Sequence, residues 1–298
     1  MAVRATVEAL LRERKLDRTL TSAIPERLGE DAVSPLDVEA LDRSLAGLAG
    51  PQDKRAGLAG PQDKKVAGGL PRGQVSEVVG PASSGRTGLV WAALAAATRR
   101  GETVALIDTF DRFDPPTAAA CGLVLPRLLW VRGQAVSKTA VAIDPAWLPG
   151  VRAVNGPGTF VERVIDRAIK SLNLVVQSGV CTLVAIDLID VPAQALRRLP
   201  ASTWFRIERA IEGSDTAVVI LAAQSVARSS GGRSIAMGTD SRVSTPDSRL
   251  PTPDWKGDHD RSRRLGGVRS GAAVSAARWS HAQQVPVVTR FTHVEAGL

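Results

Sequence analysis

The sequence contains no tyrosine, two cysteines and three histidines, and aromatic residues make up 4% of its 298 residues. Two cysteines in a chain of this length exclude a disulfide scaffold and favour a reducing compartment. No apolar run reaches the roughly 18 residues that a membrane-spanning helix needs, and the first residues lack the apolar segment of a secretory signal. We therefore expect a soluble, cytoplasmic protein with no membrane partner.

The composition is that of a globular protein, with 44% hydrophobic and 23% charged residues. The net charge of +8 is uneven, because residues 191–298 contain 15 basic and 9 acidic residues. This excess favours an acidic partner such as nucleic acid. The 31 arginines against 7 lysines offer another interpretation, a general preference for arginine in this chain. Both interpretations stay open on the sequence alone.

The first 69 residues differ from the rest of the chain. Residues 6–18 have apolar residues at near-helical spacing, which predicts an amphipathic helix within an N-terminal helical segment, 1–42. Residues 46–54 and 56–64 are identical copies rich in Gly and Pro, too few for a solenoid. They indicate a duplicated linker over 43–69.

From residue 70 to 238, apolar segments alternate with helical patterns. We predict strands over 75–79, 103–107, 127–131, 181–186 and 217–222, and helices over 88–100, 160–176 and 203–211. Strands that are apolar on both faces and alternate with helices indicate an α/β core with a mostly parallel central sheet flanked by helices. Residues 239–270 are polar and predict a flexible insertion. Strands over 272–279 and 285–294, within residues 271–298, would then complete the core.

The segment Gly80-Pro81-Ala82-Ser83-Ser84-Gly85-Arg86-Thr87 has the spacing of a phosphate-binding P-loop, with Arg where the motif has Lys. It lies between a predicted strand and a predicted helix, as the motif requires. Glycines let backbone N–H groups surround an anion, and the helix N-terminus adds its dipole. The candidate nucleotide ligands here are Gly80, Ser83, Ser84, Gly85, Arg86 and Thr87. A guanidinium binds phosphate but is bulkier than an ammonium group.

A second element of nucleotide sites follows about a hundred residues later. Leu183-Val184-Ala185-Ile186-Asp187 is an apolar strand that ends in a carboxylate, which is typical of a Walker B strand. The Thr87 hydroxyl and Asp187 are therefore the candidate ligands of Mg²⁺. His259, His281 and His293 are scattered, which argues against a zinc site.

Other chemically notable residues have simpler interpretations. Cys121 and Cys181 lie in apolar surroundings and are expected to pack in the core rather than act as nucleophiles. Trp91 and Trp204 lie on predicted helices and are expected to pack as well. Trp255, in the polar insertion, is a candidate anchor for a protein partner.

Residues 68–237 resemble the RecA core, beginning with Gly68-Gly69-Leu70-Pro71-Arg72-Gly73-Gln74 and continuing through the P-loop. Ile107-Asp108 followed by Asp114-Pro115 is similar to the segment after that family's second strand. Gly231-Gly232 extends the match. Within the superfamily the chain looks most like ImuA-type proteins of bacterial SOS mutagenesis cassettes. The resemblance implies ATP and Mg²⁺ as ligands and adds Asp114, Asp187 and Gln224 to the nucleotide site.

The departures from the RecA pattern concern catalysis. The position of the family's catalytic Glu is Phe110 here, and a phenyl ring cannot accept a proton. With Arg86 in the P-loop as well, the sequence argues against efficient ATP hydrolysis, and we assign no catalytic residue. The resemblance places DNA contacts in a second loop, on Arg228, Gly231, Gly232 and Arg233. The first DNA-binding loop, after Asp187, looks reduced.

The resemblance implies an accessory protein in DNA repair and translesion synthesis, cytoplasmic and associated with the nucleoid when active. Its partners would be an ImuB-like Y-family polymerase homologue, RecA, an error-prone DNA polymerase and single-stranded DNA. Its mechanism would be recruitment by a scaffold with weak or absent ATP hydrolysis. One alternative is an ATP-dependent recombinase that binds single-stranded DNA and tolerates Arg86 and Phe110. Another is a cell-division inhibitor of the SulA type.

Overall fold

The computed structural model describes residues 33–47, 68–137, 141, 160–227, 231–238, 252–256, 264–276 and 283–290. In chain order the elements are β1 (Val33–Ser34), α2 (Glu39–Gly47), β2 (Leu70–Pro71), β3 (Val75–Val79), α3 (Arg86–Arg99), β4 (Val104–Asp108), α4 (Pro115–Ala120), the 3₁₀ helix η1 (Leu125–Arg127), β5 (Leu128–Arg132), α6 (Phe160–Ser178), β6 (Leu183–Leu188), α7 (Ala193–Arg198), α8 (Ala201–Ile211), β7 (Ala217–Ala222), β8 (Arg233–Met237), β9 (Thr252–Lys256), β10 (Arg264–Ala276) and β11 (Gln283–Arg290). The predicted helix 6–18 and nearly all of the 46–64 repeat lie outside the described residues.

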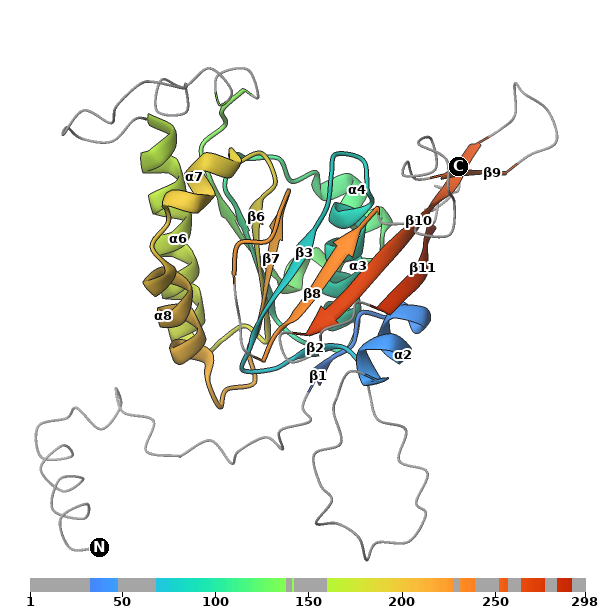
Figure 1. Ribbon diagram of the computed structural model, residues 1–298, viewed down its shortest axis with the longest axis horizontal. Helices are drawn as coiled ribbons and strands as arrows, with labels where there is room; N and C mark the ends of the chain where they lie inside the picture. The colour runs from blue at the N-terminus through green and yellow to red at the C-terminus, as the bar shows by residue number, and fades with distance from the viewer. Residues whose placement is uncertain are drawn as a thin grey trace, which may run out of the picture.

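The molecule is built on a mixed, mostly parallel sheet of nine strands among the described residues, in the order β11-β10-β8-β3-β7-β6-β4-β5 with β9 paired to β10 (Figure 1). From β8 to β5, each strand of this order is parallel to the next one. β10 is antiparallel to the three strands beside it, β8, β9 and β11. This arrangement confirms the predicted α/β fold with a mostly parallel sheet.

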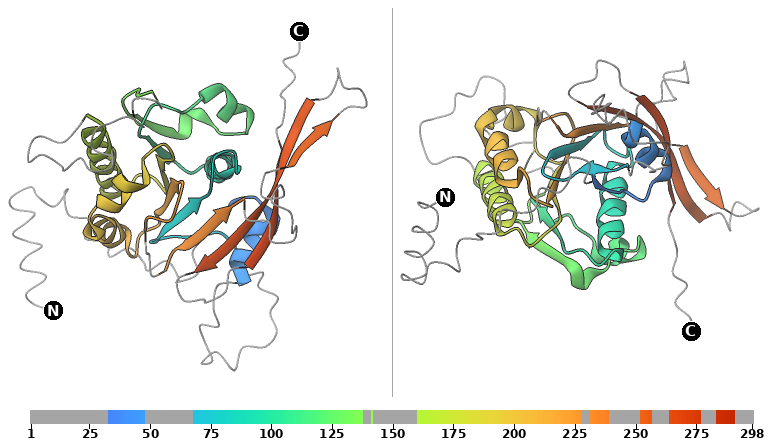
Figure 2. Two further views of the ribbon diagram at one scale, coloured as in Figure 1. Left: turned by 45° about the horizontal axis from the view of Figure 1, so that its top comes forward. Right: turned by 90° about the horizontal axis from the view of Figure 1, so that it is seen from below.

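Helices cover both faces of the sheet (Figure 2). One hydrophobic cluster lies under α6 and α8 and contains alternate residues of the parallel strands, such as Val184 and Ile186 of β6. The other lies under α3 and contains the intervening residues, such as Leu183 and Ala185. Successive strand residues point to opposite faces, so both faces of each central strand are buried, and the central strands are mostly apolar, with Ser76 and Glu77 of β3 as buried polar exceptions.

The N-terminal segment belongs to the core up to residue 47, so the predicted boundary at residue 42 is wrong. It falls inside α2, whose Leu41 and Leu45 are buried beside β10 and β11, together with Leu36. The boundary was drawn from the Gly-rich composition that follows, but the burial of these leucine side chains stabilises the segment on the core. β1 also pairs with β2 and closes this end of the molecule.

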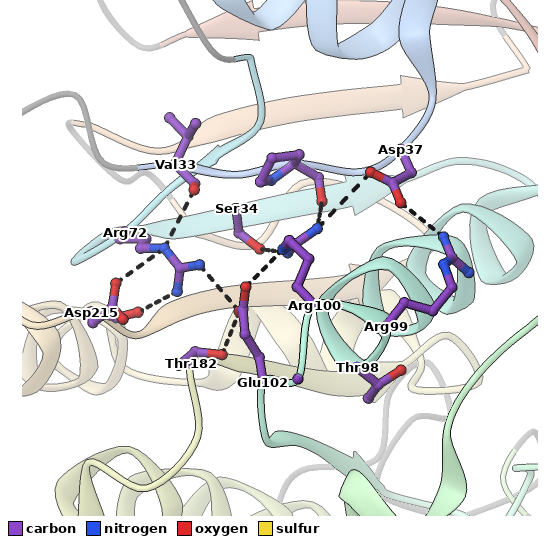
Figure 3. A network of polar contacts seen from close by, with 12 residues as sticks. Val33, Ser34, Asp37, Arg72, Thr98, Arg99, Arg100, Glu102, Thr182 and Asp215 are labelled. Carbon is purple, nitrogen blue, oxygen red and sulfur yellow. Dashed lines mark hydrogen bonds and ion pairs between the residues drawn. The ribbon is translucent and has the colours of Figure 1, made fainter.

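A polar network holds the N-terminal segment against the edge of the sheet where the parallel strands begin (Figure 3). Arg72 donates hydrogen bonds to the Val33 carbonyl, at 3.3 Å, and to Glu102, at 3.1 Å. Glu102 also accepts from Arg100, at 2.7 Å, and from Thr182, at 2.7 Å. The largest effect on the pKa of Glu102 is burial, which raises it, but these donors together outweigh burial and lower it.

The C-terminal region differs from its prediction. Residues 252–256 form β9 and residues 264–270 form the first half of β10, so these parts of the predicted insertion are strands. β10 pairs with β9 through Arg264–Arg269 and with β8 through Ala272–Ala276, and these backbone hydrogen bonds are a tertiary contribution that a polar composition does not reveal. The closing strands predicted over 272–279 and 285–294 exist as β10 and β11 with shifted bounds. Among the described residues, no helix is long and apolar enough to cross a membrane.

Candidate functional site

The segment Gly80–Thr87 joins β3 to α3 at the edge of the sheet where the parallel strands end (Figure 1). Ser83 and Gly85 have left-handed backbone conformations, with φ of 60° and 87°. A Cβ atom on Gly80 would lie 2.7 Å from the Met237 carbonyl oxygen and 2.7 Å from Ser84 Oγ. The loop therefore requires glycine at this position, and it folds as a tight strand-to-helix turn of the kind that surrounds anions.

Two polar side chains in this loop are buried without a partner. Ser84 Oγ and Arg86 Nη1 find no hydrogen-bond partner among the described residues, and Ser84 and Arg86 are 1% and 6% exposed. The N-terminus of α3 has no side-chain cap either. Buried polar groups are nearly always hydrogen-bonded, so orphaned donors beside a helix N-terminus fit an anionic ligand such as phosphate.

Two carboxylates beside the P-loop affect the pKa of Arg86. Burial lowers the pKa of Arg86, while the negative charges of Asp187 and then Asp190 raise it. Burial also raises the pKa of Asp187 to about 6, helped by the charges of Asp108 and Asp190 and opposed by the Ile189 N–H and by Arg86. A nearby cation would stabilise the charged form of this buried carboxyl group.

Asp187 lies on β6 directly opposite Asp108 on β4. Its Oδ1 accepts a hydrogen bond from Ile189 N at 2.9 Å. Thr87 lies in the first turn of α3. The described residues contain no group of three or more His, Cys, Asp or Glu side chains that could hold a metal ion. A Mg²⁺ ion held by Asp187 and Thr87 would take its remaining ligands from phosphate oxygens and water.

Asp108 has a structural role that sequence reasoning missed. Its carboxylate accepts hydrogen bonds from Arg112 N at 2.8 Å, Phe113 N at 2.9 Å and Trp130 Nε1 at 3.1 Å. These contacts fold the chain sharply after β4. The only signal in the sequence was a carboxylate at the end of an apolar strand, the same signal that pointed to Asp187.

Phe110 occupies the position where the resemblance places a catalytic Glu, and it is buried in the core cluster under α6, with 3% exposure. The neighbouring Asp111 is bound by Arg132, with its two oxygens 3.0 and 2.8 Å from two guanidinium nitrogens. These hydrogen bonds hold the pKa of Asp111 below its ordinary value. Neither side chain is available as a general base toward the P-loop.

The remaining predicted nucleotide ligands lie around the same edge of the sheet. Asp114 precedes α4 and accepts a hydrogen bond from the Thr117 hydroxyl. Gln224 follows β7, whose last residue pairs with Val79 just before the P-loop. No contact of Asp114 or Gln224 with the P-loop is among the interactions that the structure describes.

The predicted DNA-binding residues do not all lie in a loop. Arg233 begins β8, where its backbone N–H donates to Ser76 Oγ at 3.1 Å, and burial lowers its pKa. The prediction of Arg233 as a loop residue is therefore wrong, since Arg233 is the first residue of β8 and pairs with Ala276 of β10. Gly231 and Gly232 precede β8, and Arg228 lies outside the described residues.

The first DNA-binding loop was expected to be reduced, and part of the segment after Asp187 forms the short helix α7. Sequence reasoning also missed the ion pair between Arg112 Nε and Asp190 Oδ2, 3.0 Å long, beside the P-loop. Nothing in the spacing of these two residues indicates their contact, because they follow different strands. Glu77, buried within β3, was missed as well.

The simpler interpretations of the remaining residues are mostly confirmed. Cys181 is buried in the core and Cys121 is half-buried, and burial raises the pKa of both thiols. Trp204 is buried, and Trp91 packs edge-on against Phe113 with ring centroids 5.9 Å apart. The three histidines lie outside the described residues, and so does the side chain of Trp255.

Comparison with known proteins agrees with this geometry. Residues 57–143 match the RecA N-terminal domain family. The chain is 48% identical over 62 residues to Protein RecA of Acholeplasma laidlawii, which is 21% of this chain and 19% of the relative. It is 47% identical over 62 residues to Protein RecA of Chlorobaculum tepidum and of Chloroflexus aurantiacus, covering 21% of this chain and 18% of each relative. The alignments thus span about a fifth of these relatives' length.

The fold and the site define a P-loop α/β protein. Its matched region, which contains β3, the P-loop, α3 and β4, is RecA-like.

Proposed function

We propose that the chain is a RecA-like accessory protein of DNA repair that binds a nucleoside triphosphate at the P-loop without efficient hydrolysis. The observation that carries this proposal is the pair of Arg86 and Phe110. Arg86 places a buried cation with one orphaned donor, Nη1, in the P-loop, whereas Phe110 is a core side chain at the position expected for a general base.

In this proposal the chain's residues bind and orient but do not turn over the nucleotide. The backbone of Gly80–Thr87, Ser84 Oγ and Arg86 hold the phosphates, and Asp187 with Thr87 holds Mg²⁺. The metal neutralises phosphate charge when it is bound. Arg86 is larger than the Lys of the motif and lies within the field of Asp187 and Asp190. A planar guanidinium is bulkier than an ammonium group and donates in a fixed fork, which makes it a poorer fit for following a transferring phosphoryl group.

The finer part of the proposal is a scaffold in damage-induced translesion synthesis. Its partners would be an ImuB-like polymerase homologue, RecA and an error-prone polymerase, and single-stranded DNA would bind near Arg228 and Gly231–Arg233. This part is supported by the resemblance and by the absence of a general base at Phe110.

ATP hydrolysis with and without single-stranded DNA tests the first part, measured for the unmodified protein and for an Arg86→Lys, Phe110→Glu double variant. We expect no DNA-stimulated turnover by the unmodified protein, together with saturable binding of a fluorescent ATP analogue. Robust DNA-stimulated hydrolysis would favour the second candidate, an ATP-dependent recombinase, for which the intact geometry of the P-loop and of Asp187 is the supporting observation.

A pull-down with the purified polymerase homologue tests the scaffold. Chains that lack residues 1–20 or residues 239–298 are compared with the full chain. We expect at least one truncation to abolish retention of the partner. Equal retention by all three chains would contradict docking through these regions.

A further inference from the structure

The residues assigned to the nucleotide do not include the ion pair between Arg112 and Asp190. Arg112 follows β4 and Asp190 follows β6, and these two strands are parallel neighbours in the sheet. Arg112 Nε lies 3.0 Å from Asp190 Oδ2, and the two side chains are 33% and 16% exposed. The pair therefore lies at the edge of the sheet where the parallel strands end, which is the edge that carries the P-loop.

Asp190 is held close to the end of β6 by a tight turn. Val191 N donates a hydrogen bond to the Leu188 carbonyl at 3.1 Å, and Ile189 N donates to Asp187 Oδ1 at 2.9 Å. These bonds turn the chain directly after the strand. The backbone thus fixes where the Asp190 carboxylate begins, beside the carboxylate assigned to Mg²⁺.

Arg112 is held by three different segments. Its backbone N–H donates to Asp108 Oδ1 at 2.8 Å, and its guanidinium donates to the Val136 carbonyl as well as to Asp190. Arg112 therefore connects the chain after β4 with the chain after β5 and after β6. Since the guanidinium is fixed on two sides, it also fixes the direction in which Asp190 points.

The charge of Asp190 reaches the residues that would meet a phosphate ligand. Burial lowers the pKa of Arg86, and the charges of Asp187 and then Asp190 oppose this effect. Burial raises the pKa of Asp187, and the charge of Asp190 contributes to the rise. A carboxylate that attracts Arg86 across this edge must also repel an anion bound to Arg86.

This repulsion depends on the ligand and on Arg112. It grows with the negative charge of the ligand, so it acts more strongly on a triphosphate than on a diphosphate. The guanidinium of Arg112 offsets part of it, because the charges of an ion pair partly cancel at a distance. The two members of the pair therefore have opposite effects on an anion at the P-loop.

We propose that the Arg112–Asp190 ion pair determines how much negative charge the P-loop accepts in its phosphate ligand. Asp190 weakens the binding of highly charged ligands, and Arg112 is the residue that positions Asp190 and offsets its charge. This inference rests on the proposed function, because it concerns the ligand of the same site.

Affinities for fluorescent analogues of ATP and ADP, measured in EDTA, test the pair. EDTA removes metal ions, so the charges of the protein alone act on the phosphates. We expect Asp190→Asn to bind the ATP analogue about three- to tenfold more tightly than the wild type and the ADP analogue by a smaller factor. Arg112→Gln, which keeps a donor but no charge, is expected to bind the ATP analogue more weakly by a similar factor.

The opposite signs distinguish this role from a structural one. If the ion pair only held the two segments together, loss of either member would loosen the same edge and weaken binding in both variants. In the Asp190→Asn background, Arg112→Gln is expected to have little further effect, because no charge is left to offset. Weaker or unchanged binding in both single variants, or equal effects on the two nucleotides, would overturn the proposal.

The matched control is the ion pair between Arg132 and Asp111, which is 2.8 Å long and joins the segments that contain β4 and β5. Neither residue is among the charges that affect the pKa of Arg86 or Asp187. Asp111→Asn and Arg132→Gln are therefore expected to leave both affinities within about twofold of the wild type. Shifts of the same size as at Asp190 would mean that any charge on this edge acts alike, which would overturn the specific role of the pair.

Urea unfolding of the free protein separates this inference from the proposed function. If the wild type binds neither analogue, the proposed nucleotide binding fails, and the effect of Asp190 on Arg86 is measured without a ligand. Asp190→Asn is expected to raise the equilibrium constant for unfolding about threefold more in the wild-type background than in Arg86→Gln. Equal effects in both backgrounds would overturn the inference, because the charge of Asp190 would then not reach the P-loop.

Discussion

At the scale of single residues, the P-loop depends on one steric requirement and on a few buried polar atoms. Arg86 and Ser84 are buried with orphaned donors, and Gly80 has no room for a side chain. Such groups lower the stability of the free protein and become favourable only with a ligand. Mutations here therefore affect both stability and ligand binding.

Gly80→Ala is predicted to destabilise the protein by about 2 kcal/mol, because the new Cβ would collide with the Met237 carbonyl. It should also abolish binding of a fluorescent nucleotide. The control is Gly179→Ala, where φ is +64° and nothing lies within 4 Å of the added Cβ. That variant has only backbone strain, about 1 kcal/mol, and should bind normally. Urea unfolding and nucleotide titration measure both effects, and equal behaviour of the two variants would contradict the steric account.

Glu102 is predicted to make stability depend on pH. Because its pKa is lowered in the folded protein, the unfolded chain binds the proton more readily. The stabilisation is present above the ordinary value of 4.5 and is lost as the pH falls through the lower, folded value. Glu102→Gln should lower the unfolding free energy at pH 7 by roughly 1–3 kcal/mol and remove this dependence. Unfolding curves from pH 7 to pH 3 test it, and parallel pH profiles for wild type and variant would refute it.

At the scale of elements, the local hydrophobic pattern predicted several strands and helices accurately. The strands predicted over 75–79 and 217–222 have the predicted bounds. The helix predicted over 160–176 continues a little further, to Ser178. The strands were predictable as short, mostly apolar runs that are buried on both faces, and the helix from apolar residues at helical spacing. The boundary at residue 42 was wrong, because α2 packs against β10 and β11, far along the chain. Within the insertion predicted over 239–270, residues 252–256 and 264–270 are strands, because β9 pairs with the β10 strand that follows it.

Two leucines on α6 provide a test of its two faces. Leu172 is 0% exposed in the core cluster, whereas Leu174 is 67% exposed. Leu172→Ala is predicted to destabilise the protein by about 2–5 kcal/mol, since it leaves a cavity between the helix and the sheet. Leu174→Ala should change stability by less than about 0.5 kcal/mol. Thermal or urea unfolding distinguishes them, and similar losses for both would mean that the helix packs differently.

At the scale of the whole molecule, the basic residues that give residues 191–298 their excess positive charge do not all lie on one element. Arg233 is held in β8, and the exposed Arg197 and Arg198 belong to α7, which packs on the opposite face of the sheet from α3. Net charge alone therefore does not define a DNA-binding surface. Such a surface needs cations that remain free to contact phosphate.

If single-stranded DNA binds near Arg228 and Gly231–Arg233, as proposed, its affinity should fall as salt rises, because counterions are released on binding. Arg228→Ala is predicted to reduce the slope of log affinity against log salt by about 0.7, the contribution of one phosphate contact on a single strand. The control is Arg127→Ala, an exposed arginine that binds the Gly101 carbonyl at the other edge of the sheet. Fluorescence anisotropy at several salt concentrations measures the slopes. An unchanged slope for Arg228→Ala would remove this residue from the DNA surface.

The sequence by itself determined the alternation of apolar strands and helices, the P-loop between 80 and 87, and the carboxylate of Asp187, because each depends on neighbouring residues. Only the tertiary structure decided that residues 33–47 join the core, that Phe110 points into it and that Arg112 meets Asp190. It also decided that the buried carboxylate of Glu77 accepts hydrogen bonds from Val226 N and Ala227 N. These contacts depend on strand order, and local periodicity contains no information about which strands become neighbours.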